Sequence, residues 1–143
     1  MIVQKEFAYQ PSDNERERAS NGYLMSLLAV IVGLPLPIVN LIATFIFFLS
    51  SRKSTYFVRW HTLQALLSQA SLFLVNSVGV YWSLNIAFGT SEASNLYIGY
   101  IITIVLLNFG EFVASMYLAI NVRKGQHLAL WFYGDLTDQI CIK

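Results

Sequence analysis

The chain has 143 residues, of which 56% are hydrophobic and only 12% are charged. A soluble domain carries about 25% charged residues, so this chain has too few to cover a water-facing surface. Nine Lys and Arg against eight Asp and Glu give a formal net charge of +1, which excludes a basic field for nucleic acid. The single cysteine, Cys141, excludes an intramolecular disulfide framework and a Cys-based zinc site.

Residues 1–22 form a polar leader that mixes acidic and basic side chains with Pro11, Ser12 and Asn14. This composition predicts a mobile segment. The leader does not have the short basic start of a secretory signal, and no small-residue cleavage site follows it. We therefore expect the next apolar stretch to be retained in the membrane.

Residues 23–49 form the first apolar segment and carry no charge. About 20 apolar residues suffice to cross a hydrocarbon core about 30 Å thick, so this segment is long enough to span. Pro35 and Pro37, near its middle, each remove a backbone donor and disfavour helical geometry in the preceding residue. The segment is therefore a kinked span or a re-entrant hairpin of two half-helices. Arg16 and Arg18 in the leader favour the re-entrant form, because they resist translocation.

Two further apolar segments, residues 63–88 and 96–121, are each long enough to span. They are joined by residues 89–95, a short turn-like loop with one acid and no base. Basic residues gather instead in the loops 50–62 and 122–127. The positive-inside rule places these two loops in the cytoplasm and loop 89–95 on the other side of the cell (inner) membrane. The chain is thus predicted to be an all-α integral membrane protein.

The membrane domain covers residues 23–122, and residues 123–143 form a C-terminal tail. Arg123, Lys124 and the following glycine are a plausible end for the last helix. The tail then mixes aromatic and acidic side chains, which is typical of an interfacial amphipathic segment or of a docking segment. Trp and Tyr next to a span favour the interfacial alternative.

Polar side chains follow one face of the second segment. At 100° per residue they fall within an arc of about 160°. They are His61, Gln64, Ser68, Gln69, Ser71, Asn76 and Ser83. Such a stripe indicates hydrogen bonds between membrane helices, or else a hydrated path or substrate groove.

Glu111 is the one charged residue inside the third segment, and Asn108 and Ser115 share its face of the helix. It lies about ten residues from the cytoplasmic end, a depth of about 15 Å, so its charge is costly unless paired, hydrated or protonated. The carboxylate is therefore either functional, titrating a proton or contacting a cation, or structural, bonding to Asn76 or Gln69 across the helix interface.

His61 lies at the cytoplasmic boundary of the second segment, where an imidazole commonly acts as an anchor. The only other histidine, His127, offers no ligand spacing with it, so we predict no metal site. The sequence contains no nucleophile motif, Gly-rich phosphate loop or HExxH. We therefore expect no enzyme activity and no cofactor.

The run FVRWHTLQALL, residues 57–67, follows the proline-broken segment and an Arg-Lys loop. It resembles the signature of the plastid inner-envelope import-translocon (Tic-type) subunit family, and of a related group of small bacterial multi-pass membrane proteins of unknown function. Arg59, His61, Gln64 and Ala65 match that signature position by position. The resemblance implies a part in protein translocation or envelope assembly.

These observations lead to a non-enzymatic inner-membrane subunit of a larger complex, one that packs against other membrane proteins or copies of itself within the lipid bilayer and binds no nucleic acid. Polar residues inside the membrane are costly on an isolated bundle, which is the reason for expecting a partner. The alternative is a small proton- or solute-coupled carrier that acts as an oligomer through Glu111, with the broken helix at Pro35 and Pro37 beside its cavity.

Overall fold

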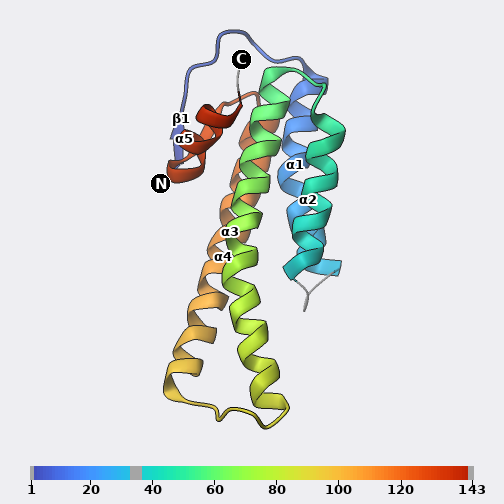
Figure 1. Cartoon of the computed structure of the whole chain (residues 1–143). Coiled ribbons are helices and arrows are strands. Elements are labelled where there is room, and N and C mark those ends of the chain that lie inside the picture. The colour runs from blue at the N-terminus through green and yellow to red at the C-terminus, as the bar shows by residue number, and fades with distance from the viewer. Residues whose placement is uncertain (1, 33–36, 142–143) are drawn as a thin grey trace.

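The computed structural model describes residues 2–32 and 37–141, which form a bundle of helices with a pair of short strands near one end (Figure 1). The elements in chain order are β1 (Ile2–Gln4), α1 (Asp13–Val32), α2 (Pro37–Ser51), α3 (Tyr56–Ala87), α4 (Asn95–Arg123), β2 (Leu128–Leu130) and α5 (Trp131–Ile140). The predicted helical class is therefore confirmed.

The helices α3 and α4 form a long hairpin. They contain 32 and 29 residues, which at 1.5 Å per residue gives lengths of about 48 and 44 Å. Both are long and apolar enough to cross a membrane, and a shorter apolar helix covers Ile38–Ser51. In the turn between α3 and α4, Gly89 has a φ of 73°, and the Ser94 hydroxyl accepts a hydrogen bond from Tyr97 N at 3.2 Å. These two features reverse the chain and start α4.

The first apolar segment is divided between α1 and α2. α1 ends at Val32 and α2 begins at Pro37; residues 33–36, which include Pro35 and the predicted kink or turn, lie outside the described residues. Arg18, near the start of α1, donates to the backbone oxygen of Ser50, near the end of α2, at 2.7 Å. The two helices therefore return to the same end of the bundle. Figure 1 shows them beside only one half of the α3–α4 hairpin.

The leader contains more regular structure than its composition suggests, because α1 begins at Asp13 and not after residue 22. Ser12 and Glu15 explain this early start. The backbone N–H and the hydroxyl of Ser12 both donate to the Glu15 carboxylate at 2.7 Å. This S-x-x-E capping box satisfies donors at the helix start, so the helix extends through the charged residues ahead of the apolar ones.

Residues 2–12 and 124–141, which we call the head, pack together at one end of the bundle. β1 and β2 pair antiparallel, with Val3 opposite Ala129. The expected interfacial tail is therefore partly docked: Ala129 is buried, whereas Trp131 and Phe132 at the start of α5 are 70% and 66% exposed. These two exposed rings are suited to the headgroup zone of a membrane.

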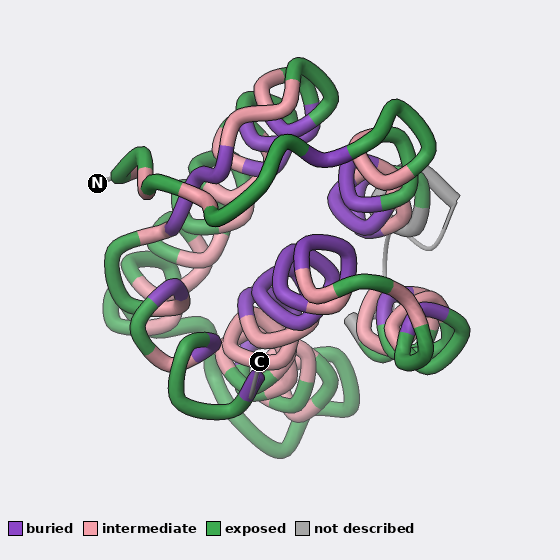
Figure 2. Tube along the Cα trace, turned by 90° about the horizontal axis from the view of Figure 1, so that it is seen from above, coloured by how far each residue is buried: buried purple, intermediate pink, exposed green. Residues whose placement is uncertain are grey.

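The hydrophobic core lies where α1, α3, α4 and the head meet. Viewed along the bundle, the buried residues face its middle (Figure 2). The main cluster consists of Ala19, Tyr23, Phe57, Ala65, Leu118, Ala119, Val122 and Leu128. Further from the head, large apolar side chains such as Leu74, Leu106 and Phe109 are exposed on α3 and α4. Lipid or another protein must cover a surface of this kind.

Two leucines on α4 test where the core lies. Leu118 is fully buried, whereas Leu106 is 65% exposed. We expect Leu118→Ala to lower the free energy of unfolding by about 2–5 kcal/mol, because it leaves a cavity. Leu106→Ala, the matched control, should change it by less than about 0.5 kcal/mol. Titration of the protein in mixed micelles with a denaturing detergent measures both, and equal effects would contradict this location of the core.

Candidate functional site

The polar residues predicted at the interface of the second and third segments meet between α3 and α4. Asn76 and Asn108 exchange side-chain hydrogen bonds at 3.0 and 2.7 Å. Ser68 and Ser115 both donate to one carboxylate oxygen of Glu111, Ser115 at 3.1 Å. Glu111 thus bonds to two hydroxyls, and not to Asn76 or Gln69, the partners expected for a structural carboxylate. These contacts join the two helices at a depth where lipid offers no hydrogen bonds.

The same contact between α3 and α4 continues toward the far turn. Ser83 and Tyr97 share a hydrogen bond of 2.9 Å, and Tyr100 donates to the backbone oxygen of Val75 at 2.9 Å. Gly79 is buried, and a Cβ atom at its position would collide with Ile104. The small residue in the polar stripe therefore permits a close approach of the helices, as small residues do at membrane interfaces.

A small cavity lies beside Glu111 and reaches α1. Its volume is about 30 Å³, and its lining includes Ser26, Gln69, Asn108 and Ser115. A cavity of this size has room for about one or two water molecules. It is too small for a substrate groove.

The motif residues Gln64 and Ala65 lie nearer the head, on the buried side of α3. The oxygen of the Gln64 amide accepts from the backbone N–H of Leu130 at 3.0 Å, and its nitrogen donates to the backbone oxygen of Leu128 at 3.3 Å. Gln64 thus bonds to one edge of β2 as a neighbouring strand would, while β1 occupies the other edge. Ala65, 3% exposed, belongs to the core cluster.

His61 continues this polar contact as part of a buried chain of hydrogen bonds. The Gln64 amide nitrogen donates to the Tyr23 hydroxyl at 2.7 Å. The Tyr23 hydroxyl lies 2.9 Å from His61 Nδ1, and His61 Nε2 lies 3.1 Å from His127 Nδ1. All four side chains are buried. The chain therefore ties α1, α3 and the head together.

The contact between His61 and His127 could not be predicted from their spacing in the sequence. β2 brings the two rings together, because its pairing with β1 and Gln64 fixes the residue just before it. Even so, no group of three or more His, Cys, Asp or Glu suited to a metal ion occurs among residues 2–32 and 37–141.

Three side chains that were not predicted as site residues, Lys5, Trp60 and Asp138, attach α5 to the rest of the protein. Trp60 donates to Asp138 at 2.7 Å, and the Lys5 ammonium contacts the same carboxylate at 2.5 Å. Burial opposes the charge of Asp138, but the bonds from Lys5 and Trp60 prevail and lower the pKa of this carboxyl. Arg59, the remaining motif residue, is half-buried on α3 near Cys141. The motif as a whole lies where α3 meets the head.

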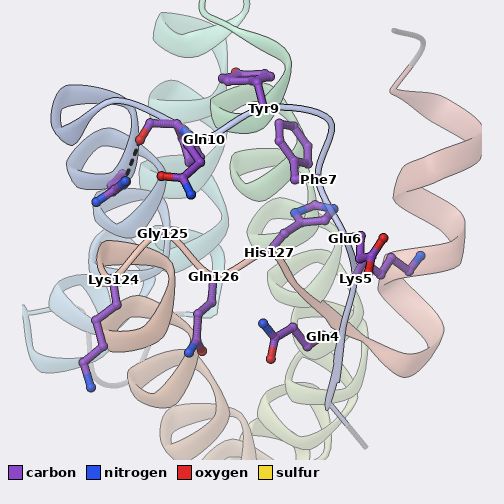
Figure 3. A pocket seen from close by; sticks show the side chains of 12 residues that line it. Gln4, Lys5, Glu6, Phe7, Tyr9, Gln10, Lys124, Gly125, Gln126 and His127 are labelled. Carbon is purple, nitrogen blue, oxygen red and sulfur yellow. Dashed lines mark hydrogen bonds between the residues drawn. The ribbon is translucent and has the colours of Figure 1, made fainter.

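Two hollows open on the head, one polar and one aromatic. The polar hollow has a volume of about 660 Å³ and lies between residues 4–11 and 124–127 (Figure 3). The aromatic hollow has a volume of about 330 Å³ and is lined mainly by Phe7, Tyr9 and Tyr56. His127 lines both.

The fold and these contacts define a small helical membrane protein with a polar contact between its two longest helices and a docked head. The chain matches the model of the magnetosome magnetite crystal formation protein family over residues 18–135, more than half of its length, and belongs to that family. Membership indicates a membrane-associated role in magnetosome formation. The predicted bacterial membrane family is therefore confirmed in this broad sense, whereas no finding links the chain to plastid translocon subunits or to protein translocation. Comparisons with curated proteins and with solved structures give no match.

The buried position of His127 predicts a pH dependence of the docked head. Burial lowers the pKa of His127 to about 4, with Lys5 also lowering it and Asp138 opposing. When the head is undocked, this histidine takes up a proton near its ordinary pKa of 6.5, so stability conferred by docking is complete above that pH and is lost as the pH falls toward 4. We expect the thermal midpoint to fall by about 5 °C or more between pH 7 and pH 4.5.

The matched variant is His127→Asn, because the Asn oxygen can still accept from His61 but does not titrate. Its thermal midpoint should fall less steeply over the same range than that of the unchanged protein. Equal slopes for the two proteins would show that His127 does not carry the effect.

Proposed function

We propose that the chain is a non-enzymatic subunit of the magnetosome membrane, and that it acts in magnetite crystal formation by assembling with other membrane proteins or with copies of itself. Family membership supports the location in the magnetosome membrane and the part in crystal formation. The assembly is supported by one observation above all: α1 and α2 are too short to reach across the membrane beside α3 and α4.

The pair α1–α2 is too short to accompany α3 and α4 across a membrane. α2 has 15 residues, or about 22 Å, and the apolar part of α1 from Tyr23 to Val32 is shorter still. Both helices start or end at the head, as the bond between Arg18 and Ser50 requires. Their other ends therefore lie partway through a hydrocarbon core about 30 Å thick.

Helix ends at that depth need partners. The last four carbonyls of a helix and the first four amides have no partners within the helix, and lipid offers none. Protein or a water-filled space must therefore surround them. The exposed apolar side chains of α2, Ile42 at 48% and Ile46 at 60%, offer a surface for such a neighbour.

Polar side chains inside the membrane were the reason for expecting a partner, but the contacts between α3 and α4 already satisfy them. The polar stripe does not need another protein, because Ser68, Asn76 and Ser83 all bond within the chain. The same pairing speaks against a solute carrier, since the cavity at Glu111 has a volume of only about 30 Å³. The need for a neighbour comes from the helix ends of α1 and α2.

The basic residues support one orientation. Arg18, Arg52, Lys53, Arg123 and Lys124 belong to the ends of α1, α2 and α4 that lie near the head. By the positive-inside rule the head then faces the cytoplasm, and the turn between α3 and α4 faces the interior of the magnetosome. This arrangement agrees with the re-entrant form of the first segment.

Assembly is tested by photo-crosslinking in cells that form magnetosomes. A photoreactive amino acid at Ile46, on the exposed side of α2, should give crosslinks to membrane proteins or to a second copy. The control position, Leu96, is 78% exposed at the far end of α4 and should give several-fold fewer. Equal yields at the two positions, or a strictly monomeric uncrosslinked protein, would contradict the proposal.

Deleting the gene should alter the size or number of magnetite crystals in electron micrographs, and unaltered crystals would count against a part in their formation.

Orientation is tested by labelling single cysteines in a Cys141→Ser background. A cysteine at Gln10, in the exposed leader, should react with a membrane-impermeant reagent only after the cells are opened. A cysteine at Ser91, in the exposed turn, should be protected on the opposite side of the same membrane. Labelling of both positions from one side would contradict the single crossing, by α3, that the proposed topology places between them.

A further inference from the structure

The aromatic hollow has the size and the walls of a small-molecule site. Its volume of about 330 Å³ lies within the range of ligand pockets, about 300–1,000 Å³. Phe7 forms part of the wall, with its ring centroid 5.0 Å from that of Tyr9 and 5.8 Å from that of Tyr56, nearly parallel to the latter at 18°. Flat aromatic faces therefore form part of the wall, beside the charged residues Lys5, Glu6 and Asp138.

The buried chain of hydrogen bonds fixes which nitrogen of His127 carries the proton. The Gln64 oxygen accepts from Leu130 N, so the Gln64 nitrogen is the group that donates to Tyr23. The Tyr23 hydroxyl then donates to His61 Nδ1, which leaves the proton of His61 on Nε2. His61 Nε2 donates to His127 Nδ1, and His127 must carry its own proton on Nε2.

Within residues 2–32 and 37–141 this N–H group has no hydrogen-bond partner. The His127 side chain as a whole is only 6% exposed, but its Nε2 is not among the fully buried polar atoms that lack a partner, so the atom reaches open space. The ring lines the aromatic hollow. A donor that reaches such a hollow can bond to water, and the acceptor of a ligand can take the place of that water.

The charges around the hollow select an uncharged ligand. Lys5 is already paired with Asp138 at 2.5 Å and with Asp135 at 3.5 Å. Burial keeps His127 neutral at physiological pH by lowering its pKa to about 4. The other charge on the wall, Glu6, repels anions. No uncompensated cation therefore remains to hold a negatively charged group.

The polar hollow is less suited to a ligand. Its guanidinium group, Arg16, already donates to Pro11 O at 2.8 Å and contacts Asp13 at 3.4 Å. Figure 3 shows the side chain of Lys124 directed away from His127 and the leader. The aromatic hollow is the one that combines the rings of Phe7, Tyr9 and Tyr56 with the His127 side chain in a mainly apolar wall.

We propose that the aromatic hollow binds an uncharged planar molecule, an aromatic ring that bears a carbonyl oxygen, as in an aromatic amide or a quinone. The ring packs against Phe7, Tyr9 and Tyr56, and the carbonyl oxygen accepts the hydrogen bond from His127 Nε2. The site lies between the head and Tyr56 at the start of α3, and it does not depend on the assembly proposed above.

Three probes with the same ring but different charge test the selectivity. Benzamide is neutral with a carbonyl, benzoate is anionic and benzylammonium is cationic. Saturation-transfer NMR on the full chain in detergent micelles should show benzamide binding with a Kd on the order of 1 mM, as expected for so small a ligand. Benzoate and benzylammonium should bind at least about 5-fold more weakly. Equal binding of all three, or none by benzamide, would overturn the proposal.

Two variants and a control localise the binding. Tyr9→Leu removes a flat wall, and His127→Asn removes the ring nitrogen that donates, so each should weaken benzamide binding at least about 3-fold. Trp131→Leu removes an aromatic ring that is exposed elsewhere on the head and should leave binding unchanged. If benzamide bound equally to all four proteins, it would be partitioning into the micelle, and the assignment of the hollow would be wrong.

The proton position gives an independent readout. Long-range ¹H–¹⁵N spectra of His127 should show a protonated Nε2 without ligand, and the Nε2 signal should shift when benzamide is added. A proton found on Nδ1 would remove the donor and refute the proposal.

Discussion

The side-chain amide of Gln64 joins the helical bundle to the head, and the buried part of the structure depends on it. Its oxygen and nitrogen bond to the edge of β2 while the nitrogen also bonds to Tyr23. In a low-dielectric interior, each unpaired polar group is costly, so such a network is stable only when every member has its partner. The amide therefore fixes the position of β2 along the axis of α3. The positions of His127 and β1 follow from it.

Away from the head, the solvent around the helices sets the constraints. A hydrocarbon surround offers no hydrogen bonds, so each polar side chain on α3 and α4 needs a protein partner or water. Asn76 with Asn108, and Ser68 with Glu111, meet that need within one hairpin. The helices α1 and α2 do not meet that need in the same way. In the proposed arrangement they end partway through the membrane, and the terminal amides and carbonyls of a helix have no partners within the helix. This contrast is why the proposed assembly surface lies on α2 and not along the polar stripe.

The head combines two properties that follow from the same buried chain. Burial in the head keeps His127 neutral, and the same residue lines the aromatic hollow. The structural role and the proposed binding role therefore meet in one side chain. Lys5 and Asp138 hold the neighbouring helix α5 against Trp60 and neutralise each other beside that hollow.

The sequence by itself determined the class of protein and the approximate limits of its apolar segments, because lipid imposes length and composition on any span. It also predicted an interruption around Pro35 and Pro37, since proline acts on its own backbone, and the first apolar segment is indeed divided between α1 and α2. Ser12 and Glu15, three residues apart, carried a readable capping signal as well, although the leader's composition suggested mobility. Each of these features depends on residues close together in the chain.

The tertiary structure alone decided which distant side chains meet. The polar face of α3 was visible in the sequence, but its upper part bonds to α1 and β2 and its lower part to α4. The contact of His61 with His127 depends on where β2 lies along the axis of α3, and the spacing of residues in the sequence does not encode that position. Register between separate elements is set by the packing of the whole core, which is why Glu111 bonds to Ser68 and Ser115 and not to Asn76 or Gln69.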